Sequence, residues 1–344
     1  MAIRAGIINV TGYAGAELLK ILWHHPEVEV VSVTGRSAAG KQLPEVLPHL
    51  SRIDLPITET VEGSVDVAFS ALPSGASAEA LLPIVNGGAK AIDIAADFRM
   101  HDVAEYERAY KTVHPAPHLV EKAVYGLPEI HRQAISSTSL VANPGCYAEA
   151  SILGLAPAVK EGIVADDIIV DAKSGISGAG RGGLSASTLD HFAEADENVV
   201  AYGLEGHGHQ PEIAQELGEL REASQARVTF IPHRIPMVRG IMATCYASLL
   251  DSSINREEVL ELYRDFYAGE PFVRVTSQPP QTKHTSGTNN CLVHPTVDVK
   301  AGKLVVVSCM DNLINGAAGQ AVQNMNLMFG LDETAALDLL ALNP

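Results

Sequence analysis

The first 145 residues alternate short apolar runs with amphipathic segments. The apolar runs have the length of buried strands, and the segments between them repeat their apolar positions every three or four residues, as helices do. The expected strands are 5–10, 28–34, 65–72, 89–96 and 139–145, and the expected helices are 15–23, 76–85 and 103–110. This alternation predicts a parallel sheet flanked by helices.

The pattern changes after residue 160, where strand-like runs become longer and turn residues separate them. These runs cover 166–174, 226–233, 239–250 and 303–310. Residues 299–306 predict a hairpin with 301–303 in its middle, and we expect the neighbouring strands to form a mixed or antiparallel sheet. The last strong pattern, at 315–330, predicts a helix that ends at Gly330. A second domain is therefore expected to begin near Cys146.

The composition narrows the class of protein. The chain has 344 residues, of which 47% are apolar, and this is enough to bury the cores of two domains. Its net charge is −17 and no stretch concentrates Lys or Arg, which disfavours nucleic acid or an anionic membrane as a partner. No apolar run approaches the roughly 20 residues of a membrane helix. The N-terminus shows no cleavage-site pattern, and the four cysteines include no Cys-x-x-Cys pair, so we expect a cytoplasmic protein.

Two glycines join the first expected strand to the first expected helix. Gly12 and Gly15 lie in the run IINVTGYAGAELLK, where N–H groups at a helix start favour a phosphate and glycine permits its close approach. This predicts a dinucleotide site, although a turn shaped for packing alone uses the same residues. About 20 positions later, where an acid would select NAD, Arg36 and Ser37 follow the second strand instead. We therefore expect NADP(H), with a merely solvated loop as the alternative.

A cysteine stands at the start of another expected helix. Cys146 follows Asn-Pro-Gly in the run VANPGCYAEA, and the helical spacing of the next apolar residues places its thiol in the first turn. Unpaired N–H groups and the helix dipole stabilise a thiolate there, so Cys146 is a candidate nucleophile. The alternative is a buried thiol beside a turn. Cys245, Cys291 and Cys309 lie inside strand-like runs and are expected to be buried.

A thiol nucleophile needs an acid–base group, and the run EGHGHQPEI at 205–213 offers two histidines. If this segment is extended, His207 and His209 point the same way, and Pro211 marks a plausible helix start. The pair and its flanking glutamates would also suit zinc, but no third and fourth ligands occur at a recognised spacing. A surface loop is the remaining alternative.

The run SGISGAGRGG at 174–183 has five glycines in ten positions, and Arg181 is its only charge. Such a loop forms poor structure unless something approaches its backbone closely, and the alternative is a flexible linker. Three more arginines, Arg99, Arg234 and Arg239, offer a forked guanidinium to a carboxylate or phosphate, or else form surface ion pairs.

Taken together, these motifs are specific. The chain contains, in order, TGYAGAELL, DFR, YGLPE, NPGCYAEA, SGISGAGRGG, GHGHQPEI, FIPHRIPMVRGI, TNN and DNLINGAAGQAVQNMN. Over nearly its whole length it resembles the N-acetyl-gamma-glutamyl-phosphate reductases of arginine biosynthesis, in the semialdehyde dehydrogenase group. The resemblance implies an α/β fold with a Rossmann-like dinucleotide-binding domain, 1–145 plus 316–344. It also implies an α+β substrate and dimerisation domain with a mixed sheet, 146–315.

The resemblance further implies an oxidoreductase that uses NADPH to reduce an acyl phosphate to an aldehyde and releases inorganic phosphate, acting as a homodimer or homotetramer. It assigns Cys146 as the nucleophile that forms a thioester and His209 as the acid–base group, and it requires no metal ion. The other expected contacts divide between substrate and cofactor. The substrate contacts are Arg99, Asn143, Ser174, Arg181, His207 and Arg239, and the cofactor contacts are Thr11, Gly12, Tyr13, Ala14, Gly15, Arg36, Ser37, Ser74, Gly178 and Asn312.

Three positions depart from the family pattern. Asn9 stands where the first glycine of the fingerprint is expected, Ser74 where a histidine is expected, and Asn315 where a lysine is expected. Alternative functions are a reductase of aspartyl or aminoadipyl phosphate, a noncatalytic nucleotide-sensing protein, and a zinc hydrolase built on the histidine pair. The motifs NPGCY and SGISGAGR favour the acetylglutamyl substrate.

Overall fold

A computed structural model describes residues 1–182, 191–221 and 226–343, and in it the chain divides into two compact units. The first unit contains Met1–Gly145, Gly180–Gly182 and Ala317–Asp338, and the second contains the described residues of Cys146–Ala179, Gly183–Gly316 and Leu339–Pro344. The residues after Asp338 thus belong to the second unit, whereas the sequence analysis assigned them to the first. They do so because the backbone N–H of Leu342 donates to the carbonyl of Ser286 at 2.9 Å.

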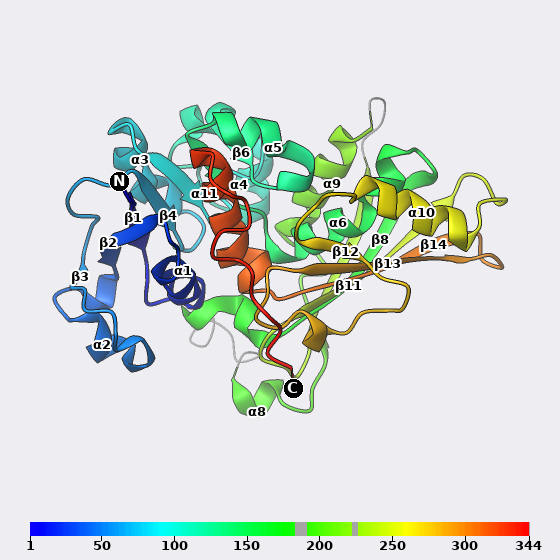
Figure 1. Ribbon diagram of the computed structural model, residues 1–344. Coiled ribbons are helices and arrows are strands. Elements are labelled where there is room, and N and C mark those ends of the chain that lie inside the picture. The colour runs from blue at the N-terminus through cyan, green and yellow to red at the C-terminus, as the bar shows by residue number, and fades with distance from the viewer. Residues whose placement is uncertain (183–190, 222–225, 344) are drawn as a thin grey trace. The chain divides into compact units, whose positions relative to one another are not determined.

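The first unit is built on a seven-stranded sheet in the order β3-β2-β1-β4-β5-β7-β6 (Figure 1). All neighbouring strands are parallel, which confirms the sequence prediction. The strands are β1 (Ile3–Ile8), β2 (Val28–Thr34), β3 (Ile57–Thr58), β4 (Val67–Ser70), β5 (Lys90–Asp93), β6 (Val124–Tyr125) and β7 (Leu140–Ala142). The helices are α1 (Tyr13–Trp23), α2 (Leu43–Val46), α3 (Ser77–Asn86), α4 (Val103–Tyr110), α5 (Pro128–Ser137) and α11 (Gln320–Phe329).

The helix α11 comes from the far end of the sequence and is held in the first unit by buried amides. The side chain of Asn324 donates to the carbonyl of Gly126 at 2.8 Å, and Asn326 shares a hydrogen bond of 2.9 Å with His25. The sequence analysis did not identify α5, although a proline at its first position, Pro128, is a typical helix start.

The second unit is built on another seven-stranded sheet, in the order β12-β13-β14-β11-β8-β10-β9. Two neighbouring pairs are parallel and the others antiparallel, so the expected mixed sheet is confirmed. The strands are β8 (Val164–Ser174), β9 (Val200–Ala201), β10 (Arg227–Arg234), β11 (Ile241–Leu249), β12 (Val273–Val275), β13 (Cys291–Asp298) and β14 (Lys303–Met310). The helices are α6 (Cys146–Lys160), α8 (Phe192–Ala195), α9 (His209–Glu219) and α10 (Arg256–Phe266).

One face of this mixed sheet is covered by helices, whereas side chains on its other face are partly exposed in the described part of the chain. Helix α6 is buried along nearly its whole length and packs with α9 and α10 against the sheet (Figure 1). The central strand β8 alternates accordingly: Ile168 and Val170 are buried, whereas Ile169 is 44% exposed. Residues of the two neighbouring strands lie on the same face as Ile169, because the strand register places Thr229 opposite it on one side and Tyr246 on the other. We call this surface the open face.

Two local predictions are changed by the structure, and one helix was not predicted. The hairpin was expected over 299–306, but its turn lies at 299–302, so it joins β13 to β14. The final helix begins with a π-helical turn, η7 (Ile314–Gly319), because the N–H of Gly316 donates five residues back to the carbonyl of Asp311. Helix α10 was missed, although Asn255 and Glu258 form a capping box at its start.

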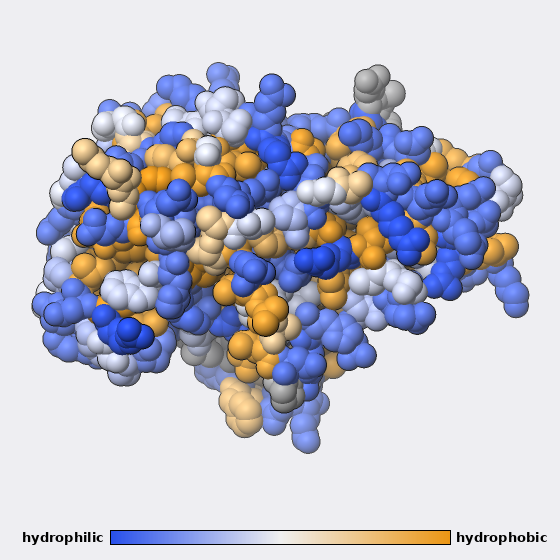
Figure 2. All heavy atoms as spheres, viewed as in Figure 1, coloured by the Kyte–Doolittle hydropathy of each residue, from blue (hydrophilic) through white to orange (hydrophobic). Residues whose placement is uncertain are grey.

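Two broader properties follow from the surface and the helices. In the view of Figure 2, hydrophilic residues cover most of the visible surface and hydrophobic patches lie between them, as expected for a chain of net charge −17. None of the helices in the described part of the chain is both long and apolar enough to cross a membrane.

Candidate active site

The turn after β1 has the shape of a dinucleotide-binding turn. Asn9 adopts a left-handed conformation, with φ of 68°, and its side chain donates to the carbonyl of Ala71 at 2.7 Å. Asparagine is one of the few residues besides glycine that tolerate this conformation, so the departure from the glycine fingerprint keeps the local backbone shape. Gly15, by contrast, cannot be replaced by another residue, because a Cβ atom there would lie 2.3 Å from the carbonyl oxygen of Asn9. The turn therefore brings the chain close to the first turn of α1.

The expected cofactor contacts of the first unit gather at the carboxyl ends of neighbouring parallel strands, where nucleotides bind in such sheets. Thr11, Gly12, Tyr13, Ala14 and Gly15 follow β1, Arg36 and Ser37 follow β2, and Ser74 follows β4. The side chains of Arg36 and Ser37 are exposed. Ser74 is also exposed, and its hydroxyl accepts the N–H of Ala96 at 3.4 Å. This arrangement fits a dinucleotide whose ribose lies beside the end of β2.

Two expected substrate contacts of the first unit also have structural partners. Arg99 is 6% exposed, and its guanidinium donates to the carbonyls of Asn143 and Ile94, both at 2.8 Å. Asn143 is fully buried, and its side chain donates to the carbonyl of Ala317 at 3.2 Å. Both residues thus fix the chain that leads to Cys146, a role that the sequence analysis missed. Arg181 lies over the ring of Tyr13, at 5.3 Å from its centre, beside the nucleotide-binding turn.

In the second unit, Cys146 is the first residue of α6, as predicted, and its side chain is only partly buried. The other three cysteines are buried as predicted, and burial raises the pKa of Cys245 and of Cys309 to about 12. The π-helical turn η7 packs directly against Cys146, because a Cβ atom on Gly316 would lie 2.7 Å from the Cβ of Cys146. Gly316 is therefore required as glycine, and the sequence analysis did not single it out.

Tyr147, the neighbour of Cys146, connects the thiol to the histidine pair. Its ring lies 6.0 Å from the ring of His207 and 5.8 Å from that of His209, both in edge-to-face contact. The hydroxyl of Tyr147 donates to the carbonyl of His233 at 3.1 Å and accepts the hydroxyl of Tyr202 at 3.2 Å. Burial raises the pKa of Tyr147, so this hydroxyl stays protonated and serves as an anchor. The ring of Tyr147 and both imidazoles thus form one packed cluster, and Tyr147 directly follows Cys146 in the chain.

The two histidines have different surroundings. The segment is helical at Gly208 and α9 begins at His209, so the extended alternative does not apply, yet the ring centres lie only 4.7 Å apart. Desolvation, followed by the charge of Arg234, lowers the pKa of His207 to about 4. His207 is therefore neutral at pH 7, and its Nδ1 accepts the N–H of His209 at 3.1 Å. Its role is to hold His209, which begins the helix.

The glycine-rich loop after β8 is closely packed from Gly175 to Gly178, which does not fit a flexible linker there. Backbone N–H groups of Gly175, Ile176 and Ser177 donate to carbonyls of the segment 237–240. A Cβ atom on Gly175 would lie 2.6 Å from the carbonyl oxygen of Val238, so only glycine fits there. Gly183, the last residue of the motif, lies outside the described residues.

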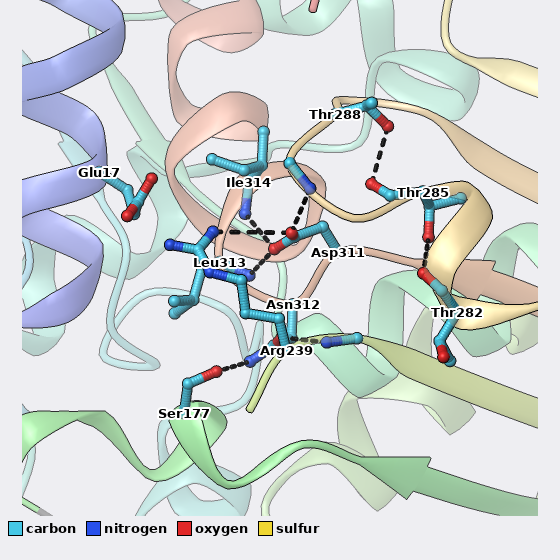
Figure 3. Close-up of polar contacts among 12 residues, drawn as sticks. Glu17, Ser177, Arg239, Thr282, Thr285, Thr288, Asp311, Asn312, Leu313 and Ile314 are labelled. Carbon is cyan, nitrogen blue, oxygen red and sulfur yellow. Dashed lines mark hydrogen bonds and ion pairs between the residues drawn. The ribbon is translucent and has the colours of Figure 1, made fainter. Parts of the chain in front are cut away.

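The predicted contacts Ser174, Gly178 and Asn312 come together at this loop. A Cβ atom on Gly178 would lie 3.1 Å from the hydroxyl of Ser174 and 3.5 Å from the amide nitrogen of Asn312. The Asn312 side chain donates to the hydroxyl of Ser177 at 2.9 Å and accepts the N–H of Gly240 at 2.7 Å (Figure 3). Asn315, where the family pattern has lysine, is 1% exposed and donates to the carbonyl of Asn289 at 2.9 Å, so this position is a compact buried one.

Arg239 borders a cavity of about 270 Å³ in the second unit. The cavity is lined by Met237, Val238, Arg239, Thr282, Lys283, Ser286 and Asn343. The guanidinium of Arg239 lies 3.6 Å from the carboxylate of Asp311, which is fully buried (Figure 3). Neither Lys283 nor Asp311 was singled out from the sequence, because no local pattern connects them to Arg239.

A zinc site on the histidine pair is not supported by the geometry of the described residues. Among them, neither His207 nor His209 belongs to a group of three His, Cys, Asp or Glu residues whose ligand atoms lie together.

Known proteins match this chain over almost its entire length. The model of the semialdehyde dehydrogenase NAD-binding domain matches residues 4–138, and that of the semialdehyde dehydrogenase dimerisation domain matches residues 146–312. An N-acetyl-gamma-glutamyl-phosphate reductase from Dehalococcoides mccartyi is 54% identical over 341 residues, which are 99% of each chain. The protein of the same name from Desulforudis audaxviator is 48% identical over 356 residues, covering 99% of this chain and 100% of its own.

Solved structures with the same fold are more distant in sequence. Aspartate semialdehyde dehydrogenase II from Vibrio cholerae has a TM-score of 0.73 at 18% identity, covering 96% of this chain and 99% of its own. An aspartate semialdehyde dehydrogenase with NADP from Candida albicans has a TM-score of 0.70 at 17% identity, covering 95% and 99%. At these identities the likeness shows a shared fold.

Proposed function

This chain belongs to the N-acetyl-gamma-glutamyl-phosphate reductases of the semialdehyde dehydrogenase family, and we propose that it acts in arginine biosynthesis. It uses NADPH to reduce N-acetyl-gamma-glutamyl phosphate to N-acetylglutamate semialdehyde and releases inorganic phosphate. The observation that carries this conclusion is an identity of 54% over 99% of both chains to a reductase of that name. The geometry of the second unit supports it, because Cys146 begins a helix beside the cluster that contains His209.

The chemistry begins at Cys146. The first turn of α6 presents backbone N–H groups and the positive end of the helix dipole, which favour the thiolate. The thiolate attacks the acyl carbon, the carbon–oxygen bond to phosphate breaks, and phosphate leaves with the bonding electrons. The product of this step is a thioester on Cys146. The partial exposure of its side chain admits the acyl group.

The second half of the reaction converts the thioester to an aldehyde. Gly12 and Gly15 would hold NADPH, which when bound would supply the hydride that reduces the thioester carbon. We assign His209 to protonate the oxyanion that forms on that carbon and to take the proton back when the carbon–sulfur bond breaks. The neutral His207 and the ring of Tyr147 hold His209 in place. The thiolate of Cys146 is regenerated when the aldehyde leaves.

The turn after β1 and the end of β2 fit NADP(H). Gly12 and Gly15 let the pyrophosphate approach the start of α1, and Arg36 and Ser37 offer donors to the 2′-phosphate. All four cysteines are thiols without a disulfide, which fits a reducing compartment, and we propose the cytoplasm as the location.

The experiment that tests the function is run in the reverse direction. We expect NADP⁺ to be reduced when N-acetylglutamate semialdehyde and phosphate are both present, and much more slowly with aspartate semialdehyde. Activity that prefers aspartate semialdehyde would move the chain to the aspartyl substrate. Nucleotide binding without turnover of any semialdehyde would support a sensor.

We expect Arg36→Ala to weaken NADPH binding and to leave NADH binding almost unchanged. A charge-assisted contact to the 2′-phosphate contributes about 1.5 to 3 kcal/mol, which corresponds to roughly a 10- to 150-fold rise in the dissociation constant. The measurement is a fluorescence titration of both cofactors, with Lys41→Ala, a nearby exposed cation, as the matched control. An equal loss for both cofactors, or a parent protein that prefers NADH, would show that Arg36 does not read the phosphate.

The second unit matches a dimerisation domain, and the chain forms a dimer. We propose that the open face of the mixed sheet is the interface, because Ile169 is 44% exposed in its centre and is flanked in register by Tyr246. We expect Ile169→Glu to produce monomers in sedimentation experiments, since an unpaired buried carboxylate costs about 3 kcal/mol or more and enters a symmetric interface twice. Val299→Glu, in the exposed hairpin turn, should leave the dimer intact. An unchanged dimer in Ile169→Glu would place the interface elsewhere.

A further inference from the structure

The turn that follows β4 lies at the point where the parallel sheet reverses its strand order (Figure 1). The chain builds the sheet from β1 through β2 to β3, and then continues with β4 on the other side of β1. In sheets of this kind, nucleotides bind at the carboxyl ends of the strands where this reversal occurs. The turn after β1 and the turn after β4, residues 71–76, are joined there, because the side chain of Asn9 donates to the carbonyl of Ala71 at 2.7 Å.

The turn after β4 has an exposed tip and a helix start that lacks a cap of its own. Pro73 and Ser74 at the tip are exposed. Gly75 follows with φ of 86°, in the left-handed region that favours glycine. Helix α3 then begins at Ser77, and its N-cap residue, Ala76, has no side chain that could accept a hydrogen bond. The free N–H groups of this helix start therefore need acceptors from another segment.

Asp97, in the turn that follows β5, supplies these acceptors. It is fully buried. Its Oδ1 accepts the N–H of Gly75 at 2.7 Å, and its Oδ2 accepts the N–H of Ala78, in the first turn of α3, at 2.9 Å. The hydroxyl of Tyr106, in α4, donates to Oδ1 at 2.8 Å. One carboxylate thus caps a helix whose first turn lies 19 residues away in the sequence, and it also holds the turn before that helix.

The neighbours of Asp97 keep this arrangement in one state. Tyr106 is fully buried, and its burial, followed by its hydrogen bond to Asp97, raises its pKa, so its hydroxyl remains a donor. The hydroxyl of Ser77 donates to the buried carboxyl of Asp93, at the end of β5, at 2.5 Å. The end of β5 therefore holds the turn after β4 on both sides of Ala76.

We propose that Asp97 is a positioning residue for the cofactor, and that it sets the turn after β4 so that the exposed tip meets the part that NADP(H) and NAD(H) share. The proposal rests on the proposed function, in which the 2′-phosphate lies at the end of β2. Strand β2 is on the opposite side of β1 from β4, so the tip lies away from that phosphate. Asp97 is buried and acts through the backbone that it holds.

The test is Asp97→Asn, which keeps the shape of the side chain. Its amide group replaces one acceptor oxygen by a donor, so one of the hydrogen bonds to Gly75 and Ala78 is lost and a buried N–H is left without an acceptor. We expect the dissociation constants of NADPH and NADH to rise together, each by about tenfold, in a fluorescence titration. In the reverse reaction, kcat at saturating NADP⁺ and the KM for phosphate should stay unchanged.

The matched control removes another helix cap of the same unit. Asp102 accepts the N–H of Ala104 at 2.8 Å and caps α4. Asp102→Ala should lower Tm and leave both dissociation constants unchanged, because α4 is capped away from the strand ends. A lower Tm in Asp97→Asn with both dissociation constants unchanged would overturn the proposal. A rise for NADPH alone, or a rise only in the KM for phosphate or for the semialdehyde, would overturn it as well.

If Asp97→Asn does not fold, two glycines of equal conformation still decide. Gly75 and Gly88 both have φ of 86°, so alanine strains the backbone equally at either position. Space is not limiting, because a Cβ atom on Gly75 would lie 3.7 Å from Oγ1 of Thr112, and one on Gly88 would have no described atom within 4 Å. Gly75→Ala should raise both dissociation constants about fivefold or more, and Gly88→Ala, in the turn after α3, less than about twofold.

Equal dissociation constants in the two glycine variants would overturn the role of the turn after β4. Binding is measured without substrate, so this result does not depend on turnover. A parent protein that binds NADPH and turns over no semialdehyde would contradict the proposed function, while the titrations would still decide the role of Asp97.

Discussion

Cys146→Ser is expected to abolish turnover while NADPH binding stays nearly intact. The serine hydroxyl has a pKa far above that of a thiol, so it provides almost no anion at neutral pH, even with the helix dipole in its favour. We expect residual activity below about a hundredth of the parent, which corresponds to a barrier at least ~2.7 kcal/mol higher. The nucleotide-binding turn, Arg36 and Ser37 lie in the first unit, whereas Cys146 begins the second, so a titration with NADPH should give nearly the parent dissociation constant.

The control uses a cysteine that the mechanism does not need. Cys291 is fully buried and its sulfur lies 3.3 Å from the hydroxyl of Ser308, so Cys291→Ser keeps a polar partner and should remain active. Iodoacetamide should inactivate the parent and modify Cys146 ahead of the three buried thiols. Activity in Cys146→Ser above the stated limit, or inactivation without modification of Cys146, would remove it from the nucleophile role.

The fold was predicted well where short-range pattern decides it. The alternation of apolar runs and amphipathic segments predicted the parallel sheet, and the long strand-like runs predicted the mixed sheet. Cys146 was placed at a helix start because Pro and Gly precede it and helical spacing follows. These features depend on neighbours within a few residues.

Other parts of the site depend on contacts between distant segments, and these could not be predicted. The side chain of Asn312 accepts the N–H of Gly240, which lies 72 residues away in the sequence. No residue spacing in either segment predicts this hydrogen bond. The contact of Gly316 with Cys146 likewise depends on a π-helical turn inside a segment whose apolar pattern predicts a regular helix. Arg99 was expected on the substrate because a guanidinium suits an anion, and its hydrogen bonds to backbone carbonyls of its own unit could not be predicted from local pattern. The residue types in the sequence indicated which chemistry is possible. The tertiary contacts, which the sequence does not show, determine the partners of each side chain.

The histidine pair shows why environment decides between similar residues. The sequence offered both imidazoles at equal distance from Gly208, and the structure distinguishes His207 by its desolvation and by the nearby charge of Arg234. Because the pKa of His207 is lowered to about 4, from about 6.5 in an unfolded chain, this ring binds fewer protons when folded. Its contribution to stability is therefore full above pH 6.5 and is lost as the pH falls toward 4. Over the usual assay range it is neutral and serves as an acceptor for the N–H of His209.

His209→Asn is accordingly expected to lower kcat by roughly 10²- to 10⁴-fold, the usual contribution of a positioned acid–base group. His207→Asn should cost less, because asparagine keeps a carbonyl oxygen that can accept the N–H of His209. The two variants also differ in their pH profiles. His207→Asn should keep the shape of the parent's dependence of kcat on pH, since His207 does not titrate in the assay range. His209→Asn should lose the part of this dependence that the acid–base group produces. A larger loss in His207→Asn, together with an unchanged profile in His209→Asn, would transfer the acid–base role to His207.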